Sequence, residues 1–257
     1  MAALSFTRDG SVARLVFQRP DVLNALDTEM ARGLRDACRS IAADPEVRVV
    51  VMSGAGRAFV AGGDIAVMRE DPVANAGELI DLAHEALRLL AGLQAPVVAS
   101  LHGVVAGGGL GIALSADLAI AAEGTRFNLA YANIGTSCDC GNSWALPRIV
   151  GTRKALEIAL LSDTFDAQEA LRLGLVNRVV EPASLAEETE KLVQRLARGA
   201  PLALGNLKRL MRESFDRSLS EQLDAERAAF LQCAASDDFR EGMDAFSHKR
   251  PARYRGS

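Results

Sequence analysis

The sequence predicts an α/β protein whose strands pair mainly in parallel. Three observations support this fold class. Short apolar runs rich in valine alternate with longer segments of helical periodicity up to Val180. From Ser184 onward the strand-like runs stop and only helical patterns follow. A chain of 257 residues is also long enough to bury a sizeable core.

The elements of the first part follow from these periodicities. Expected strands cover 12–17, 47–52, 97–101 and 175–180, and expected helices cover 28–42 and 78–93. The helix at 28–42 has apolar residues at the helical period, which form one stripe facing a core: Met30, Leu34, Cys38 and Ile41. The run Asp166–Glu169 resembles a capping box and begins a short helix that ends at Gly174.

The C-terminal part of the chain is expected to be entirely helical. Its helical patterns cover 184–197, 202–212, 218–232 and 237–246. We therefore divide the chain into an α/β core at residues 1–195 and a helical region at 196–257. The apolar stripe with Leu219, Leu223 and Phe230 packs either on the chain's own core or on another subunit. The sequence leaves both possibilities open.

The composition excludes several classes of partner. A formal net charge of −4 with 24% charged residues gives no basic surface for nucleic acid or anionic lipid. No apolar run approaches the ~20 residues that span a bilayer, and no export signal is visible, so we expect a soluble cytoplasmic protein. Four cysteines are too few for a disulfide framework, and His84, His102 and His248 form no ligand cluster, so we expect no metal.

Two glycine corners are the most informative motifs of the chain. The run 107–111 lies between an apolar stretch and a helical one, so we expect its backbone amides at the start of a helix, where they could bind an anion. A second corner, 59–64, directly follows the strand-like run 48–53. Two corners that present amides favour one oxyanion hole. The alternative is that these glycines only make tight turns and close helix packing.

Nucleotide cofactors fit these corners poorly. The register Gly-x-Gly-x-x-Gly that begins at Gly107 reaches Ile112 instead of a glycine, and the chain contains no Gly-Lys pair for a phosphate-binding loop. We therefore expect no bound dinucleotide and no other resident cofactor.

Several further motifs, taken with these corners, indicate a family. They are Arg19-Pro20, the segments 23–26 and 56–65, the stretch from Pro96 through the glycine run, Phe127, Ile134-Gly135, 146–151 and the tail with Phe246. Over nearly its whole length the chain resembles the crotonase, or enoyl-CoA hydratase/isomerase, superfamily. The resemblance implies a spiral of ββα units followed by a helical trimerisation region, assembled as a homotrimer or dimer of trimers. It also implies acyl-CoA thioester substrates, with coenzyme A present only as part of the substrate.

The resemblance places the two oxyanion donors on the backbone amides of Gly63 and Gly108, within the same two corners. Donors there polarise a thioester carbonyl, and they stabilise the enolate that forms when a proton leaves the neighbouring carbon. Ala61, Asp64 and Ile65 are expected to line the acyl-CoA pocket. For Asp64, a plain helix cap is the alternative.

The chain departs from the family at both catalytic glutamates of the hydratases. Those positions hold Gly111 and Tyr131, and neither residue supplies a carboxylate acid or base. Water addition by the two-glutamate mechanism should therefore fail.

A carboxylate does follow Tyr131 in the sequence. Asp139, flanked by uncharged residues, resembles the aspartate with which the isomerases of ring-opened phenylacetate-type enoyl-CoAs move a proton along the acyl chain. We therefore expect an isomerase in which Asp139 is the proton shuttle. The alternative is a loop carboxylate that caps a helix at 142–146.

Other activities stay open at this point. The 4-chlorobenzoyl-CoA dehalogenases also have an aspartate there, as a nucleophile, with a histidine base where His84 stands and an indole where Tyr131 stands. His84 could instead pack beside the apolar stripe of its helix, and Tyr131 could shape the acyl pocket or be a core aromatic. A hydratase of unusual mechanism and a non-catalytic acyl-CoA-binding protein are further alternatives, and Asp139 argues against the latter.

Overall fold

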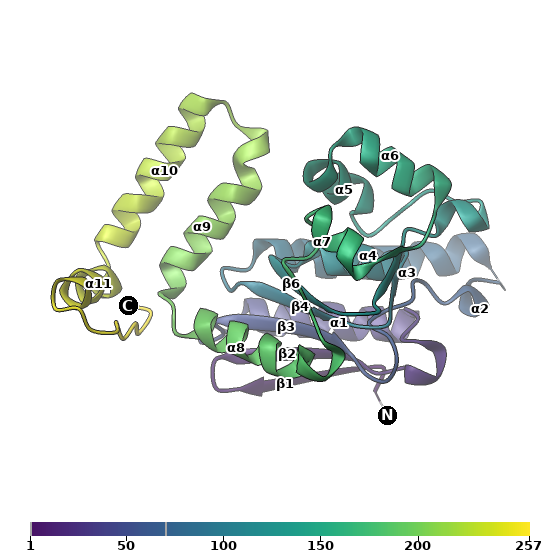
Figure 1. The fold of residues 1–257 in the computed structure, drawn as a ribbon, viewed down its shortest axis with the longest axis horizontal. Helices are drawn as coiled ribbons and strands as arrows, with labels where there is room; N and C mark the ends of the chain where they lie inside the picture. The colour runs from purple at the N-terminus through teal and green to yellow at the C-terminus, as the bar shows by residue number, and fades with distance from the viewer. Residues whose placement is uncertain (1, 70) are drawn as a thin grey trace.

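The computed structural model describes residues 2–69 and 71–257. Its main element is a six-stranded sheet, and Figure 1 shows how helices surround it. The strand order is β1-β2-β3-β4-β6-β9. The strands are β1 (Leu4–Asp9), β2 (Val12–Phe17), β3 (Val49–Gly54), β4 (Val97–Leu101), β6 (Leu118–Ala122) and β9 (Arg178–Val180). β1 pairs antiparallel with β2, and every other neighbouring pair in this sheet is parallel. The predicted α/β class with mainly parallel pairing is confirmed.

A second, three-stranded sheet positions the glycine corner at 107–111. It consists of β5 (Val104–Ala106), β7 (Arg126–Asn128) and β8 (Phe165–Asp166), in that order. β5 directly follows β4 and leads into helix α4 (Gly108–Ser115). β7 follows β6 in the same way and leads, through the short helix η2 (Tyr131–Ile134), to α5 (Asn142–Val150). These repeats of two strands and a helix are the ββα units that the resemblance implied.

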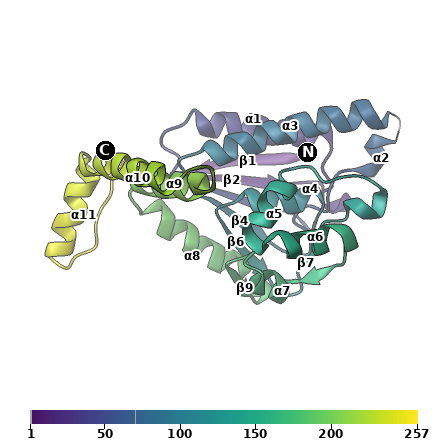
Figure 2. The ribbon, with the colours of Figure 1, turned by 90° about the horizontal axis from the view of Figure 1, so that it is seen from above.

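Helices cover both faces of the large sheet (Figure 2). On one face α1 (Thr28–Ala42) lies beside α3 (Pro72–Gly92), and α1 buries the predicted stripe Met30, Leu34, Cys38 and Ile41. On the other face α8 (Leu185–Ala197) buries Val193 against valines of β2, β3 and β4. Because successive side chains of a strand point to opposite faces, β3 is apolar throughout its buried length.

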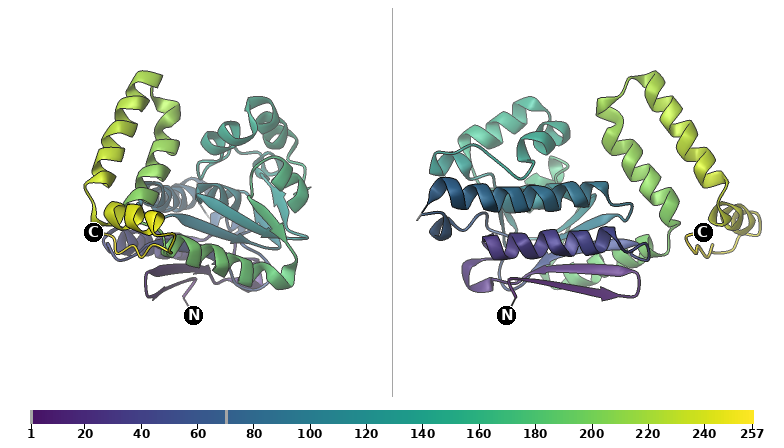
Figure 3. Two further views of the ribbon diagram at one scale, coloured as in Figure 1. Left: turned by 60° about the vertical axis from the view of Figure 1, so that its left-hand side comes forward. Right: turned by 180° about the vertical axis from the view of Figure 1, so that it is seen from behind.

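The remaining helices include a hairpin that stands away from the core (Figures 1 and 3). They are η1 (Pro20–Val22), α2 (Ile65–Met68), α6 (Thr152–Leu161), α7 (Ala167–Arg172), η3 (Pro182–Ser184), α9 (Pro201–Glu213), η4 (Ser214–Asp216), α10 (Leu219–Ala234) and α11 (Asp237–Ser247). The hairpin is α9 and α10, and two ion pairs fasten α9 to the core. Lys208 and Arg212 contact the Asp117 carboxylate at 2.9 and 2.7 Å.

The apolar stripe of α10 does not pack on the chain's own core. Leu219, Leu223 and Phe230 are 76%, 55% and 63% exposed, and Phe246 of α11 is 87% exposed. Of the two possibilities that the sequence left open, packing on this chain's core is therefore excluded for these side chains.

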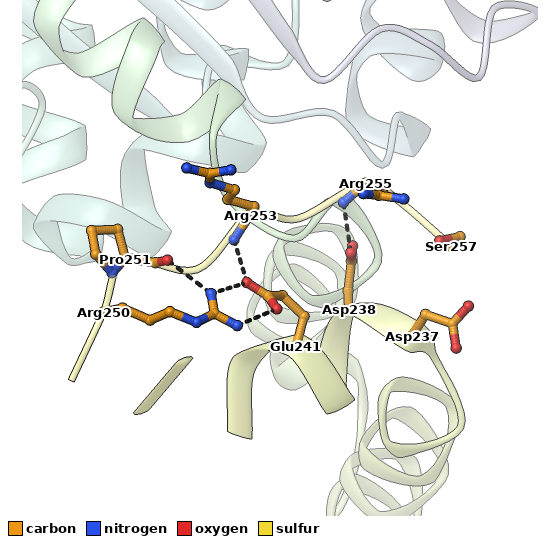
Figure 4. Close-up of a pocket in the computed structure, with 8 residues that line it drawn as sticks. All are labelled: Asp237, Asp238, Glu241, Arg250, Pro251, Arg253, Arg255 and Ser257. Atoms are coloured by element: carbon orange, nitrogen blue, oxygen red, sulfur yellow. Dashed lines mark hydrogen bonds and ion pairs between the residues drawn. The ribbon is translucent and has the colours of Figure 1, made fainter. Parts of the chain in front are cut away.

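The C-terminal tail contacts α11, as Figure 4 shows, and it also contacts the core. Arg250 forms ion pairs with Glu241 and Asp244, and the Asp238 carboxylate accepts hydrogen bonds from the backbone of Arg255 and Gly256. Arg48, just before β3, donates to the carbonyl oxygens of Tyr254 and Arg255 at 3.0 and 2.7 Å. The tail therefore fixes the position of α11.

Some elements differ from the sequence-based expectation. Helix α3 begins at Pro72 instead of residue 78, because Asp71 caps it by accepting from the Ala74 amide. The strand expected at 175–180 forms only from Arg178, since Leu175 is used to close the end of α7. Asp166 caps α7 as predicted, although Glu169 pairs with Arg172 and does not complete the box. No described helix is long and apolar enough to cross a membrane.

Candidate active site

The two glycine corners lie against each other. Val60 forms a parallel bridge with Val105 of β5, and the Ala106 amide donates to the Val60 carbonyl at 3.0 Å. This pairing brings Gly62 and Gly107 together, so a Cβ added to Gly107 would lie 3.4 Å from the Gly62 Cα. Both glycines have positive φ, 111° and 51°, a backbone conformation that side chains disfavour.

Both corners contain backbone amides without an acceptor among the described residues, Gly63 in one and Gly108 in the other among them. Leu26 brackets Gly63, because its amide donates to the Gly62 carbonyl at 2.7 Å and its carbonyl accepts from the Asp64 amide at 2.9 Å. Gly108 is the first residue of α4, where an amide has no partner within the helix. Within the described part of the chain, neither the Gly63 nor the Gly108 amide has a hydrogen-bond acceptor. Backbone amides without an acceptor are the kind of donor that an oxyanion hole uses.

A buried polar network behind the first corner fixes its shape. Asn24 is fully buried in a left-handed conformation, and its side-chain amide donates to the carbonyls of Ala55 and Ala58 at 2.9 and 2.7 Å. Its side-chain oxygen accepts from the Arg19 amide at 2.8 Å. Because the side-chain amide of Asn24 bonds to backbone groups on both sides of it, this network stabilises one conformation of the turn before Gly62.

Asp64 belongs to this supporting network. Its carboxylate accepts from the Ala66 amide at 3.1 Å, which caps α2, and it pairs with the Arg19 guanidinium at 2.9 Å. Asp64 is absent from the described residues that line the cavity in front of the corners. Of the two roles considered for Asp64, the geometry corresponds to the helix cap, with the ion pair to Arg19 added.

A cavity of about 410 Å³ opens in front of the two free amides. Its lining includes the other residues singled out from the sequence: Ala61, Gly63, Ile65, His84, Gly108, Tyr131 and Asp139. Ile65 and Ile134 are more than half exposed and mark its mouth, while Leu79, Ala83 and Cys140 are buried and mark its deep end. The structure therefore brings all the expected site residues except Asp64 to one cavity.

Asp139 and Tyr131 form a hydrogen-bonded pair beside the second corner. The Tyr131 hydroxyl donates to Oδ1 of Asp139. A Cβ added to Gly108 would lie 3.7 Å from that oxygen, so the carboxylate is adjacent to the free amide. Burial, and then the Asp139 charge, raises the pKa of the Tyr131 phenol well above its usual range. The phenol therefore stays protonated and acts as a donor.

Asp139 does not cap α5. That helix begins after Gly141, which has a left-handed conformation, and no side chain accepts from its first amides. The helix-cap alternative for Asp139 is therefore excluded, and its carboxylate faces the cavity.

Gly111 leaves no room for a side chain. A Cβ there would fall far inside van der Waals contact with the Cys140 carbonyl oxygen, and it would lie 2.7 Å from the Cys140 Cβ. It would also lie 2.8 Å from Nδ2 of Asn142. The turn at 140–142 therefore occupies the space that a hydratase glutamate at this position would need.

His84 connects α3 to the same turn. Its Nε2 accepts a hydrogen bond from the Cys140 amide at 3.1 Å, so Nε2 carries no proton in this arrangement. The ring is half-buried and lines the deep end of the cavity. Sequence reasoning did not identify this contact, nor the lining residues Met68, Leu79 and Cys140. The apolar stripe of α3 was the available signal, and it was interpreted as packing alone.

The chain is similar to known proteins over nearly its whole length. The family model described as enoyl-CoA hydratase/isomerase matches residues 7–257. The 1,2-epoxyphenylacetyl-CoA isomerase of Escherichia coli K12 is 34% identical over 249 residues, which cover 95% of each chain. The crotonyl-CoA hydratase of Syntrophomonas wolfei is 33% identical, covering 96% of this chain and 95% of its own. The crystal structure of an enoyl-CoA hydratase from Polaromonas sp. JS666 superimposes with a TM-score of 0.92 at 32% identity, over 98% of this chain and 99% of that one.

Proposed function

Because the chain belongs to the enoyl-CoA hydratase/isomerase family, we propose that it is an enoyl-CoA isomerase that moves a double bond along the acyl chain of a coenzyme A thioester. One observation carries this proposal. Of the described residues that line the cavity, Asp139 is the only one with a carboxylate, and it lies beside a free oxyanion-type amide. A single base next to an oxyanion hole suffices for proton transfer between two carbons.

The proposed reaction begins with the thioester oxygen bound between the Gly63 and Gly108 amides. Asp139 removes a proton from carbon 2 of a 3-enoyl-CoA, and the electron pair spreads into a dienolate whose oxygen charge the two amides stabilise. Asp139 then returns the proton to carbon 4, which leaves the double bond between carbons 2 and 3. No atom is gained or lost, so the reaction needs no cofactor beyond the coenzyme A of the substrate.

Tyr131 assigns different tasks to the two oxygens of Asp139. Oδ1 accepts from the phenol. Burial, and then the Asp139 charge, raises the pKa of the neighbouring Cys140 thiol, so this thiol stays protonated beside the carboxylate. In the proposed mechanism Oδ2 takes the proton up and delivers it, while the phenol holds the carboxylate in place. Tyr131 is thus a positioning residue at a place where the hydratases have an acid–base glutamate.

Two other activities are less well supported. Hydration by two glutamates lacks both carboxylates, and the Gly111 position is closed by the turn at 140–142. Dehalogenation is favoured by the presence of His84 and Asp139 in one cavity. However, it needs an indole where Tyr131 stands, and Nε2 of His84 is already bound to the Cys140 amide.

The test of this function is the variant Asp139→Asn, which keeps the size of the side chain and removes the base. Wild-type protein should interconvert 3-enoyl-CoA and 2-enoyl-CoA and incorporate solvent deuterium into the acyl chain. The variant should lose ~100-fold or more of that rate and still bind acyl-CoA. Release of chloride from 4-chlorobenzoyl-CoA without deuterium exchange would indicate a dehalogenase instead. A wild-type protein that binds acyl-CoA without exchange would be a passive binder.

We also propose a homotrimer or a dimer of trimers, in which partner subunits cover the exposed stripe of α10. Sedimentation at micromolar concentration should give the trimer or hexamer mass, and deletion from Ser218 onward should abolish that assembly. A sharp monomer, or unchanged assembly after the deletion, would contradict the proposal.

A further inference from the structure

A second hollow lies directly behind the deep end of the candidate active site. This groove of about 860 Å³ runs between α3, α5 and α9. Leu87, Ala91, Leu93 and Trp144 supply apolar surface to it, and charged residues of α9 line it as well. His84 lines both the groove and the active-site cavity.

The two hollows meet at the ring of His84. On α3, Ala83 lines the active-site cavity, and Leu87, one turn later, lines the groove. On the facing turn, Cys140 lines the cavity, and the next residue, Gly141, lines the groove. The hydrogen bond from the Cys140 amide to Nε2 of His84 joins the helix to the turn at this point. The imidazole ring therefore forms a partition between the two hollows.

The orientation of a bound thioester follows from the position of the amides. Its carbonyl lies at Gly63 and Gly108, and the bulky coenzyme A can leave only through the exposed mouth at Ile65 and Ile134. The acyl chain then extends in the opposite direction, toward the end lined by buried Ala83 and half-buried His84. A chain that extends past this end would reach the imidazole, which lines both hollows.

We propose that His84 sets the longest acyl chain that the enzyme accepts, by closing the cavity against the groove behind it. Chains short enough to end before the ring bind fully, and longer ones are excluded. Removing the ring would join the two hollows and let a longer chain continue along Leu87 and Ala91. The inference rests on the proposed acyl-CoA chemistry of this cavity, and it assigns His84 a role in specificity in place of one as a base.

Binding of saturated acyl-CoAs tests this inference without any turnover, because these thioesters have no double bond to move. Calorimetry on wild-type protein should show affinity that rises with chain length and then falls sharply. In His84→Ala the rise should continue, by about fourfold for each methylene that enters the groove. His84→Gln keeps bulk and an acceptor for the Cys140 amide, so it should keep the wild-type length limit.

The groove itself is tested by Ala91→Trp, which fills it without touching the active-site cavity. In the His84→Ala background this change should cancel the gain for long chains. Ala91→Trp alone, with His84 intact, should leave the binding of every chain length as in the wild type. A length limit that does not move in His84→Ala, or a wild-type protein whose long-chain binding Ala91→Trp weakens, would overturn the inference. A wild-type protein with the expected length limit but without isomerase activity would overturn only the proposed function.

Discussion

The two sides of the candidate active site are built on different principles. One side, at Gly63 and Gly108, presents only backbone amides, held by strand pairing and by the network around Asn24. The other side, formed by Tyr131, Asp139 and His84, consists of side chains from three separate segments. In the proposed mechanism, the backbone side stabilises charge on the thioester oxygen, whereas the facing side chains determine where the proton goes. On this proposal, changes to the first side should affect any reaction through an enolate, and changes to the second should affect the particular reaction.

The largest effect should come from breaking the backbone side. Gly108→Pro removes the amide hydrogen, and proline is tolerated at the first position of a helix, so the fold should survive. Turnover should fall by ~10²–10³-fold. Gly108→Ala is the matched control, because it keeps the amide and adds a Cβ 3.3 Å from the Cys140 sulfur. A folded proline variant with full turnover would mean that the second donor lies elsewhere.

Gly111→Glu tests whether a glutamate can be placed at the position where the hydratases have one. The new Cβ would collide with the turn at 140–142, so stability should fall by about 3 kcal/mol, and no hydration should appear. Urea denaturation measures the loss. Gly77→Ala is the control in a helix with open space, and it should stabilise the protein by about 0.5–1 kcal/mol. A stable glutamate variant that hydrates a 2-enoyl-CoA would show that the turn yields easily.

Tyr131→Phe should have a smaller effect on the same side. The Asp139 carboxylate loses the donor that holds it in place, so the rate should fall by about tenfold. Tyr254→Phe, whose ring is not among the residues that line the cavity, should leave the rate unchanged.

The smallest expected effect is on the alkaline titration of Tyr131, which is followed by absorbance and needs no substrate. The chain has two tyrosines, so Tyr254→Phe leaves Tyr131 alone to report phenolate absorbance during an alkaline titration. Burial and the Asp139 charge both raise the pKa of Tyr131, so its phenolate should not appear in the usual range. Adding Asp139→Asn removes the charge and should bring ionisation to lower pH, still above the ordinary value because burial remains. An unchanged titration would mean that the two groups are not coupled.

The positions of the two glycine corners could be predicted from the sequence because their signals are local. Glycines at a strand end and at a helix start are visible within a few letters, as is the alternation of elements that makes the fold α/β. Short or weakly patterned strands such as β1 and β6 were missed, since alanine in β6 has little strand preference.

For Tyr131, Asp139 and His84, the sequence indicated which residues to expect at the site but not how they contact one another. The hydrogen bond from Tyr131 to Asp139, for example, depends on how the loop folds after η2. The contact of His84 with Cys140 joins residues 56 positions apart, and the closure of Gly111 depends on that same distant turn. Asp64 allowed two interpretations, because the local sequence around a carboxylate before a helix is the same whether the side chain caps the helix or faces a ligand.

The closure of Gly111 also has a meaning for descent. If a relative with a glutamate there gave rise to this chain, the turn at 140–142 could move inward only after that side chain was lost. With the turn in its present position, a single substitution cannot place a glutamate at Gly111 without displacing backbone. The packing behind α4 would therefore oppose a return to the hydratase pattern in one step.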